Sequence, residues 1–432
     1  MTRIVGLFME DLDSSDLRDD DVAAVQGFAG RTAQTFLRGE GEPVIYLGLG
    51  TRVGWQVEQG YQALEGLSGL MAAGCNADRV WQALCSVTDE DTAREVTDVG
   101  LALALGHTTD SVTPGATVAR AIARARAWTN ASAAELNPTD FVALAEQEAV
   151  DHGLSFEATV GDDLASKGLR AILAMGSGSP HPPALIDLTY TPPSPRARVT
   201  LIGKGVTFDT GGLSLKSPHA MSSMRQDKCG AATILAVMGA LQDLQVEVEV
   251  RALLPVIENM IGPRSMRPGD SVDAWDGTRI TVLDTDFEGR VILADALALA
   301  SSSQPDLIVD VATLTYQVVI ALGPGIGGLF SRDDATAALV KSASESAGEP
   351  LWRLPYDERY LSEVRTATGV KNHPESENGR AITAALFLGQ FVPAHLPWAH
   401  LDISGPAWRG PAGADGATGF GVRTILSLLR AL

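Results

Sequence analysis

The chain has 432 residues, which is enough for two domains rather than one core. Its 33 basic and 53 acidic side chains give a formal charge of −20, which argues against binding to the phosphate backbone of nucleic acids. The three cysteines, Cys75, Cys85 and Cys229, are too few for a disulfide scaffold, and we expect reduced thiols in the cytoplasm. There is no signal-peptide pattern and no apolar run of about 18 residues, so we expect no membrane span.

The first part of the chain, residues 1–112, alternates strand-like apolar runs with helical patterns and predicts a smaller, macro-like α/β domain. We expect strands at residues 4–8, 43–49 and 99–105, and helices near residues 22–36, 54–73 and 77–84. This part shows no cluster of titratable residues with catalytic spacing. A scaffold or oligomerisation role is therefore the favoured interpretation.

Residues 113–131 predict a linker helix with Pro114 near its start. Residues 132–432 predict a larger catalytic domain, in which Asn137 is the expected N-cap of the first helix. Strands are expected at residues 184–190, 199–202, 246–254, 280–283 and 307–311, and helices at residues 230–241 and 291–301. This alternation predicts an α/β fold with a central mixed sheet flanked by helices, whose ligands bind beyond the carboxyl ends of the strands.

Acidic side chains follow two of these strands and precede one helix: Asp209, Asp227, Asp286 and Glu288. If they converge at one edge of the sheet, their charges repel, and divalent cations would resolve that conflict. Carboxylate oxygens suit Mg²⁺ and Mn²⁺ and also accept Zn²⁺. A single Asp in a glycine-rich loop is usually a turn former or a cap, but four acidic residues between positions 209 and 288 favour a metal site.

Two other interpretations are weaker. Lys204 lies in Gly-Lys-Gly, whereas a phosphate-binding Walker loop needs Ser or Thr after its lysine. Four histidines could be considered as metal ligands, but none has the H-E-x-x-H spacing, and we expect structural or surface roles for His219, His373, His395 and His400.

The segments that carry these residues resemble the leucyl aminopeptidase family, the two-zinc cytosolic aminopeptidases. The family pattern V-G-K-G-x-T-F-D-[ST]-G-G-x-x-x-K is similar to residues 202–216, M-x-x-D-M-x-G-A-A to residues 224–232, and N-T-D-A-E-G-R to residues 284–290. Shorter matches are D-V-A-T-L-T at 310–315, W-R-L-P at 352–355, G-G-A-I-T-A-A at 379–385 and W-A-H-L-D-I at 398–403. The resemblance covers residues 130–432.

The resemblance implies a role for each matching residue. The tighter metal ion would be held by Lys204, Asp209, Asp227 and Glu288, and the more exchangeable ion by Asp209, Asp286 and Glu288. Lys216 and Arg290 would be the catalytic pair. Lys216 would stabilise the oxyanion, and Arg290 would hold a bicarbonate anion that accepts a proton from the attacking water. The substrate pocket would include Met224, Phe287, Thr313, Leu314 and Tyr316. The two divalent ions would be Zn²⁺ or Mn²⁺, with Mg²⁺ or Co²⁺ as alternatives.

The implied function is a metal-dependent aminopeptidase, a homo-hexamer that hydrolyses the N-terminal residue from peptides or aminoacyl amides by a two-metal-activated water. Four positions depart from the family pattern: Asp284, Phe287, Lys228 and Tyr316 stand where Asn, Ala, Met and Gly are usual. Because Phe287 and Tyr316 add bulk, an alternative is a specialised two-metal amide hydrolase or acyl transferase with one dedicated, biosynthetic substrate. A non-catalytic scaffold is the third hypothesis.

Overall fold

The computed structural model describes residues 3–8, 35–38, 44–50, 57–65, 80–81, 84, 88, 90–104, 114–410 and 416–432. The chain divides into two compact units, Met1–Ala123 with Glu345–Glu349, and Arg124–Ser344 with Pro350–Leu432. Most of the helix expected at 22–36, and parts of those expected at 54–73 and 77–84, lie outside the described residues. Among the described helices, none has the length and apolar character needed to cross a membrane.

The first unit contains a three-stranded sheet of order β1-β3-β2. Strand β1 (Arg3–Phe8) is parallel to β3 (Val44–Gly50), and β2 (Thr35–Arg38) is antiparallel to β3. The strands expected at 4–8 and 43–49 are thereby confirmed. Helices α2 (Val57–Glu65) and α4 (Glu90–Ala104) pack together in the same unit.

The strand expected at 99–105 is wrong, because α4 continues through residue 104. Its buried residues Ala93, Val96 and Val99 recur every third position, which is the period of one helix face. The apolar run that ends α4 is short enough to be mistaken for a buried strand. Gly100 of α4 lies against Leu64 of α2, where a Cβ would lie 2.6 Å from Leu64 Cδ1, and this close helix–helix contact fits the helical state.

The second unit is built on a nine-stranded sheet, whose order is β13-β12-β16-β11-β6-β8-β5-β4, with β7 also paired to β8. The strands are β4 (Ser155–Val160), β5 (Ala184–Tyr190), β6 (Arg198–Gly203), β7 (Gly205–Asp209), β8 (Glu249–Asn259), β11 (Leu307–Ala312), β12 (Gly327–Phe330), β13 (Leu351–Arg353) and β16 (Trp398–Asp402). The strands from β16 to β8 are parallel neighbours, whereas β5 pairs antiparallel with β8 and β12 with β16. The expected mixed sheet is confirmed.

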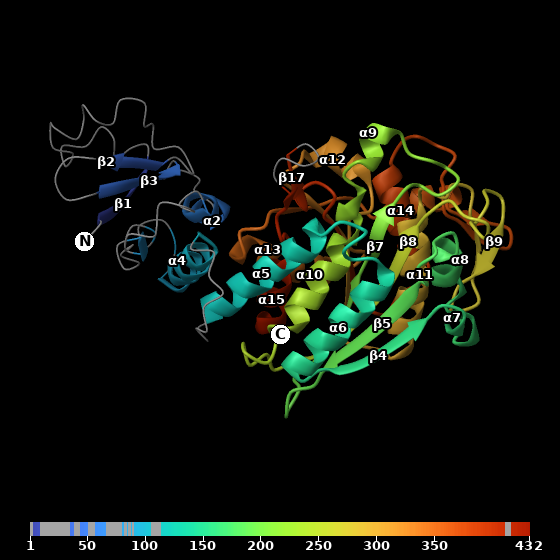
Figure 1. Cartoon of the computed structure of the whole chain (residues 1–432), viewed down its shortest axis with the longest axis horizontal. Helices are drawn as coiled ribbons and strands as arrows, with labels where there is room; N and C mark the ends of the chain where they lie inside the picture. Colours follow the sequence, from blue (N-terminus) through green and yellow to red (C-terminus); the bar gives the residue numbers. More distant parts are fainter. Residues whose placement is uncertain are drawn as a thin grey trace. The chain divides into compact units, whose positions relative to one another are not determined.

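Helices cover both faces of this sheet (Figure 1). On one face lie α6 (Pro138–His152), α10 (Cys229–Met238) and α15 (Val422–Ala431), and on the other lie α8 (Arg170–Gly176), α11 (Glu288–Ser302) and α14 (Arg380–Gly389). The remaining helices of this unit are shorter or peripheral: α7 (Asp163–Ser166), α9 (Pro218–Met221), η3 (Met224–Lys228), α12 (Tyr316–Leu322), α13 (Asp334–Ser346) and η4 (Glu358–Glu363). Helix α5 (Pro114–Asn130) continues from the first unit into the second.

The predicted N-cap of α6 is confirmed. Asn137 accepts hydrogen bonds from the backbone N–H groups of Thr139 and Asp140, and Asp140 accepts one from the Asn137 N–H. This reciprocal arrangement satisfies backbone donors that a helix start leaves free.

The strand expected at 280–283 exists as β10 (Arg279–Thr281), but it does not belong to the central sheet. It lies in a four-stranded sheet with β9 (Ser271–Asp273), β14 (Arg365–Thr366) and β15 (Gly369–Lys371). The acidic segment after β10 therefore approaches the central sheet from outside. A further pair of short strands is β17 (Trp408–Arg409) and β18 (Gly416–Ala417).

Candidate active site

The site begins at the break between β6 and β7, two successive strands that both pair with β8. Lys204 occupies the break: its backbone N–H donates to the Val311 carbonyl at 3.1 Å, and its carbonyl accepts from the Ala231 N–H at 2.8 Å. Its side chain is buried against Gly289, where a Cβ would lie 2.5 Å from Lys204 Cε. Glycine at position 289 therefore leaves room for the lysine in the position that it occupies.

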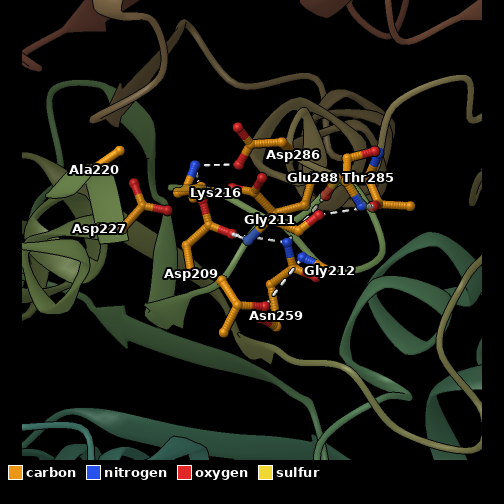
Figure 2. A network of polar contacts seen from close by, with 12 residues as sticks. Asp209, Gly211, Gly212, Lys216, Ala220, Asp227, Asn259, Thr285, Asp286 and Glu288 are labelled. Carbon is orange, nitrogen blue, oxygen red and sulfur yellow. Dashed lines mark hydrogen bonds and ion pairs between the residues drawn. The ribbon is translucent and has the colours of Figure 1, made fainter. Parts of the chain in front are cut away.

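A tight turn after β7 places Asp209 and Lys216 together. Gly211 and Gly212 have φ angles of 85° and 63°, which glycine adopts without strain. The turn returns Lys216 toward the end of β7, so that its Nζ lies 2.7 Å from Asp209 Oδ2 and also donates to Asp286 Oδ1. Figure 2 shows Lys216 between these two carboxylates.

The acidic residues converge as the sequence predicts. Oxygen atoms of Asp209, Asp286 and Glu288 lie within 4.8 Å of one another. The fourth, Asp227 on η3, is joined to them through Lys204, whose Nζ lies 2.7 Å from Asp227 Oδ1 and 3.0 Å from Glu288 Oε1. All five residues proposed as metal ligands are therefore neighbours, although they come from three separate segments of the chain.

The electrostatics of this cluster favour divalent cations. Burial, reinforced by neighbouring carboxylates, raises the pKa of Asp286 to about 7 and raises the pKa values of Asp227 and Glu288. Within the described part of the chain, Asp227 Oδ2 and Glu288 Oε2 are buried without a hydrogen-bond partner. Both oxygens have lone pairs available for a metal, and cations would offset the buried negative charge, so the residues fit such ions.

Asn259, at the end of β8, is a site residue that the sequence analysis missed. Its buried amide donates to Asp209 Oδ1 at 2.8 Å and to the Thr285 carbonyl at 3.0 Å (Figure 2). The Gly211 N–H donates to the same Asp209 oxygen, so Asp209 turns its other oxygen toward Lys216. Its position in the sequence could have indicated Asn259 as a site residue, because it ends a long apolar strand at the ligand-binding edge of the sheet.

Asn372 follows β15 and holds in place the segment that carries Asp286 and Glu288. The sequence analysis missed this residue as well. Its Oδ1 accepts from the Leu283 N–H at 2.8 Å, and its amide donates to the Asp284 carbonyl at 2.6 Å. Its own carbonyl accepts from Arg290 at 2.8 Å. No motif or apolar pattern marks this asparagine in the sequence, because its partners lie more than 80 positions away.

Arg290 is fully buried in the first turn of α11, and burial lowers its pKa to about 9. Its guanidinium lies over the Phe287 ring, 4.5 Å from the ring centroid. Among the described residues, its Nε has no hydrogen-bond partner. A buried guanidinium with an unused donor is suited to an anion, although Arg290 is not one of the described residues that line the cavity beside the carboxylates.

That cavity has a volume of about 170 Å³. Its lining comprises the five proposed metal ligands together with Lys216, Met224, Gln226, Thr313, Leu314, Thr315, Tyr316, Val319 and Ser404. Four of the five residues expected in the substrate pocket are present, and Phe287 is not. Because one water needs at least about 10–15 Å³ of such cavity volume, the cavity holds several waters and has room for a group about the size of one amino-acid residue.

Three of the four departures from the family pattern are not among the residues that line this cavity. Phe287 packs edge-on against His373, with ring centroids 4.6 Å apart, and faces Arg290. Asp284 accepts a hydrogen bond from the Asp286 N–H at 2.9 Å. Lys228 donates to the carbonyls of Ala131 and Arg225, and burial lowers its pKa to about 8. Only Tyr316, of these four, lines the cavity.

Comparison with known proteins places the chain among the metallo-exopeptidases, and the carboxylates of the acidic cluster are side chains that suit a metal site. The model of the cytosol aminopeptidase family, catalytic domain, matches residues 123–426, and the chain belongs to this family. It is therefore an aminopeptidase of a two-metal family.

Individual relatives give the extent of the similarity. A probable cytosol aminopeptidase of Microcystis aeruginosa is 38% identical over 349 residues, covering 80% of this chain and 71% of that protein. One from Rhodopirellula baltica is 39% identical over 361 residues, covering 82% and 69%. A solved structure described as the bottromycin maturation enzyme BotP in complex with Mn is 33% identical, has a TM-score of 0.85, and is matched over 100% of this chain and 99% of its own.

Proposed function

We propose that this aminopeptidase hydrolyses the bond after the N-terminal residue of peptides or aminoacyl amides. The observation that carries the proposal is the cluster of buried Asp209, Asp227 and Glu288 with half-buried Asp286, beside a cavity that fits one residue. Two divalent ions at this cluster would supply the Lewis acidity that activates water and polarises the scissile carbonyl.

The proposed assignment of ligands follows the family motifs and agrees with the geometry. One ion would be held by Lys204, Asp209, Asp227 and Glu288, and the other by Asp209, Asp286 and Glu288. Burial alone would lower the pKa of Lys204, but Asp227 and Glu288 raise it above its usual value. As a metal ligand Lys204 must be neutral, and cations beside it would reverse the effect of the carboxylates.

Lys216 is proposed as the group that stabilises the oxyanion. Burial lowers its pKa, but Asp209, Glu288 and Asp286 raise it above its usual value, so its ammonium keeps its proton. It lies in the cavity wall, where it would donate a hydrogen bond to the carbonyl oxygen as negative charge develops there.

Arg290 is proposed to hold an anion such as bicarbonate, which would accept a proton from the attacking water. Its unused Nε and its burial support this role. Phe287 and the Asn372 carbonyl would fix the orientation of the guanidinium.

The family name supports a cytoplasmic location, and the resemblance supports a homo-hexamer. Light scattering on the purified protein would test the hexamer through its mass.

A second candidate function is a dedicated peptidase with one biosynthetic substrate. The similarity to BotP, a maturation enzyme by its description, extends over essentially the full length of both chains. The curated aminopeptidases match over about 70% of their length. The bulk of Tyr316 in the cavity lining also favours a narrower substrate range.

Metal reconstitution tests the main proposal. The protein is stripped with EDTA, reloaded with Mn²⁺ or Zn²⁺, and assayed by elemental analysis and with amides of glycine, alanine, leucine and methionine. We expect two ions per chain and hydrolysis that is lost on stripping and restored on reloading. Failure to bind metal would overturn the two-metal proposal. Two bound ions with no hydrolysis of the amide panel would favour the dedicated substrate.

A further inference from the structure

Helix α12 is exposed and yet has no charged residue. Its sequence is YQVVIAL, and positions 311–331 around it contain no Asp, Glu, Lys or Arg, although charged residues make up 20% of the chain. A helix at the surface of a globular protein normally presents a polar or charged face to water. Here Tyr316 is 70% exposed and Ile320 is 69% exposed.

The exposed apolar ridge of α12 is continuous with the cavity of the candidate active site. Leu314, Tyr316 and Val319 line the cavity, and Ile320 lies one turn from Tyr316 on the same face of the helix. The apolar surface therefore runs from the interior of the site, across its rim, onto the outer face of the second unit, where Figure 1 places α12 at the edge.

We infer that this ridge, Tyr316–Val319–Ile320, binds the apolar residues that follow the cleaved bond of a peptide substrate. This inference rests on the proposed function. The cavity fits one residue, so the rest of a peptide must leave across the rim. Tyr316 and Ile320 lie four residues apart, about 6 Å along α12, which matches roughly two residues of extended peptide at about 3.3 Å each. The preferred substrate is thus a peptide with apolar residues at positions two and three.

Ile320→Ser tests the inference, because Ile320 is exposed and is not one of the cavity-lining residues. The substrates are alanine amide and the peptides Ala-Leu-Leu-Leu-Lys and Ala-Ser-Ser-Ser-Lys. We expect the wild-type protein to prefer the leucine peptide. Ile320→Ser should lower kcat/KM for that peptide about tenfold, because the variant lacks part of the aliphatic side chain that the bound peptide would bury. The values for alanine amide and the serine peptide should change less than about twofold.

Val150→Ser is the matched control, since Val150 is a β-branched residue that is 74% exposed in α6. It should leave all three kcat/KM values unchanged. Equal losses on the leucine and serine peptides, or no loss on either, would overturn the inference. A change in molecular mass by light scattering with unchanged peptide selectivity would also overturn it, by assigning the ridge to contacts between copies of the chain. Inactivity of the metal-loaded wild-type protein on all three substrates would instead count against the proposed function.

Discussion

Asp209 is held in one orientation by two hydrogen bonds to the same oxygen, from Asn259 and from the Gly211 N–H. A carboxylate that is oriented in this way loses little rotamer entropy when its other oxygen binds an ion. Groups that orient ligands in this manner are usually as important to a metal site as the ligands themselves. At the scale of single residues, Asn259 therefore belongs to the candidate site although it has no place in the proposed chemistry.

The first prediction concerns Asn259→Ala. Metal affinity should fall about 10- to 100-fold, because the variant frees Asp209 and removes the bond to the Thr285 carbonyl. Isothermal titration with Mn²⁺ measures this change. Asn378→Ala, which truncates an exposed asparagine, should bind Mn²⁺ like the wild-type protein. Unchanged affinity in Asn259→Ala would mean that the Gly211 N–H alone orients Asp209.

Lys216→Ala separates catalysis from metal binding. We expect kcat to fall about 100-fold or more, the usual cost of losing one oxyanion donor, with two ions still bound. Elemental analysis and steady-state kinetics on the same preparation measure both quantities. Lys167→Ala removes an exposed, ion-paired lysine and should leave kcat unchanged. Loss of metal in Lys216→Ala would contradict the assigned role.

The two bulky departures should behave differently, because Tyr316 lines the cavity and Phe287 does not. Tyr316→Ala should raise kcat/KM for leucine amide relative to alanine amide about tenfold or more, since one methylene in an apolar pocket changes discrimination by roughly that factor. Phe287→Ala should leave the ratio unchanged and lower the free energy of unfolding by about 1–3 kcal/mol. If Phe287→Ala raised this ratio and Tyr316→Ala left it unchanged, Phe287 would be the residue that contacts the substrate.

At the scale of secondary-structure elements, α11 links the site to the core. It begins at Glu288, and seven residues later Asp295 accepts hydrogen bonds from the Ile172 N–H of α8 and from the Trp275 N–H. Asp295 is fully buried, and burial raises its pKa to about 7. One carboxyl group thus connects α11 to α8 and to the segment between β9 and β10.

The raised pKa of Asp295 predicts how stability depends on pH. Below about pH 4 the carboxyl is protonated in both states, and between about pH 4 and pH 7 it ionises only in the unfolded state. Its contribution to the free energy of unfolding should therefore decrease by up to about 1.4 kcal/mol per pH unit across this window. Urea unfolding in EDTA at pH 5, 6, 7 and 8 measures the effect for the wild-type protein and Asp295→Asn.

The stability of the wild-type protein relative to Asp295→Asn should fall from pH 5 to pH 7 and then level. Asp151→Asn, which changes an exposed carboxylate of α6, should show a constant difference. A difference between wild type and Asp295→Asn that rises with pH would show that the backbone hydrogen bonds to Asp295 outweigh its burial.

At the scale of the whole molecule, the candidate site joins segments that are far apart in the chain. Asp209 ends a strand of the central sheet, Asp227 precedes α10, and Asp286 follows a strand of the smaller sheet. Folding must bring these charges together, so ions that bind only the folded protein should stabilise it.

Mn²⁺ at about 100 times its Kd should raise the free energy of unfolding by about 2.7 kcal/mol, as mass action requires for one site. Urea unfolding with EDTA and with Mn²⁺ measures the difference. Asp286→Asn should show a smaller increase, because it weakens one of the proposed ligands. An equal increase in both proteins would place the stabilising ion elsewhere.

Sequence alone was sufficient for features that short segments encode. The carboxylates and lysines of the site lie in contiguous motifs, and the N-cap Asn137 with Asp140 is a local pattern, so residue type and spacing predict them. The apolar runs of β5, β6 and β11 are equally local. These features need no knowledge of distant partners.

Tertiary structure decided the rest. Helix α4 lies against Leu64 of α2 at Gly100, a contact that the local sequence does not reveal, and Asn372 acquires its role from partners more than 80 residues away. Phe287 lies between two proposed ligands in sequence, yet its ring faces Arg290 and His373 rather than the cavity. The direction of a side chain and the state of a short apolar run depend on contacts between distant segments, which local residue order does not specify.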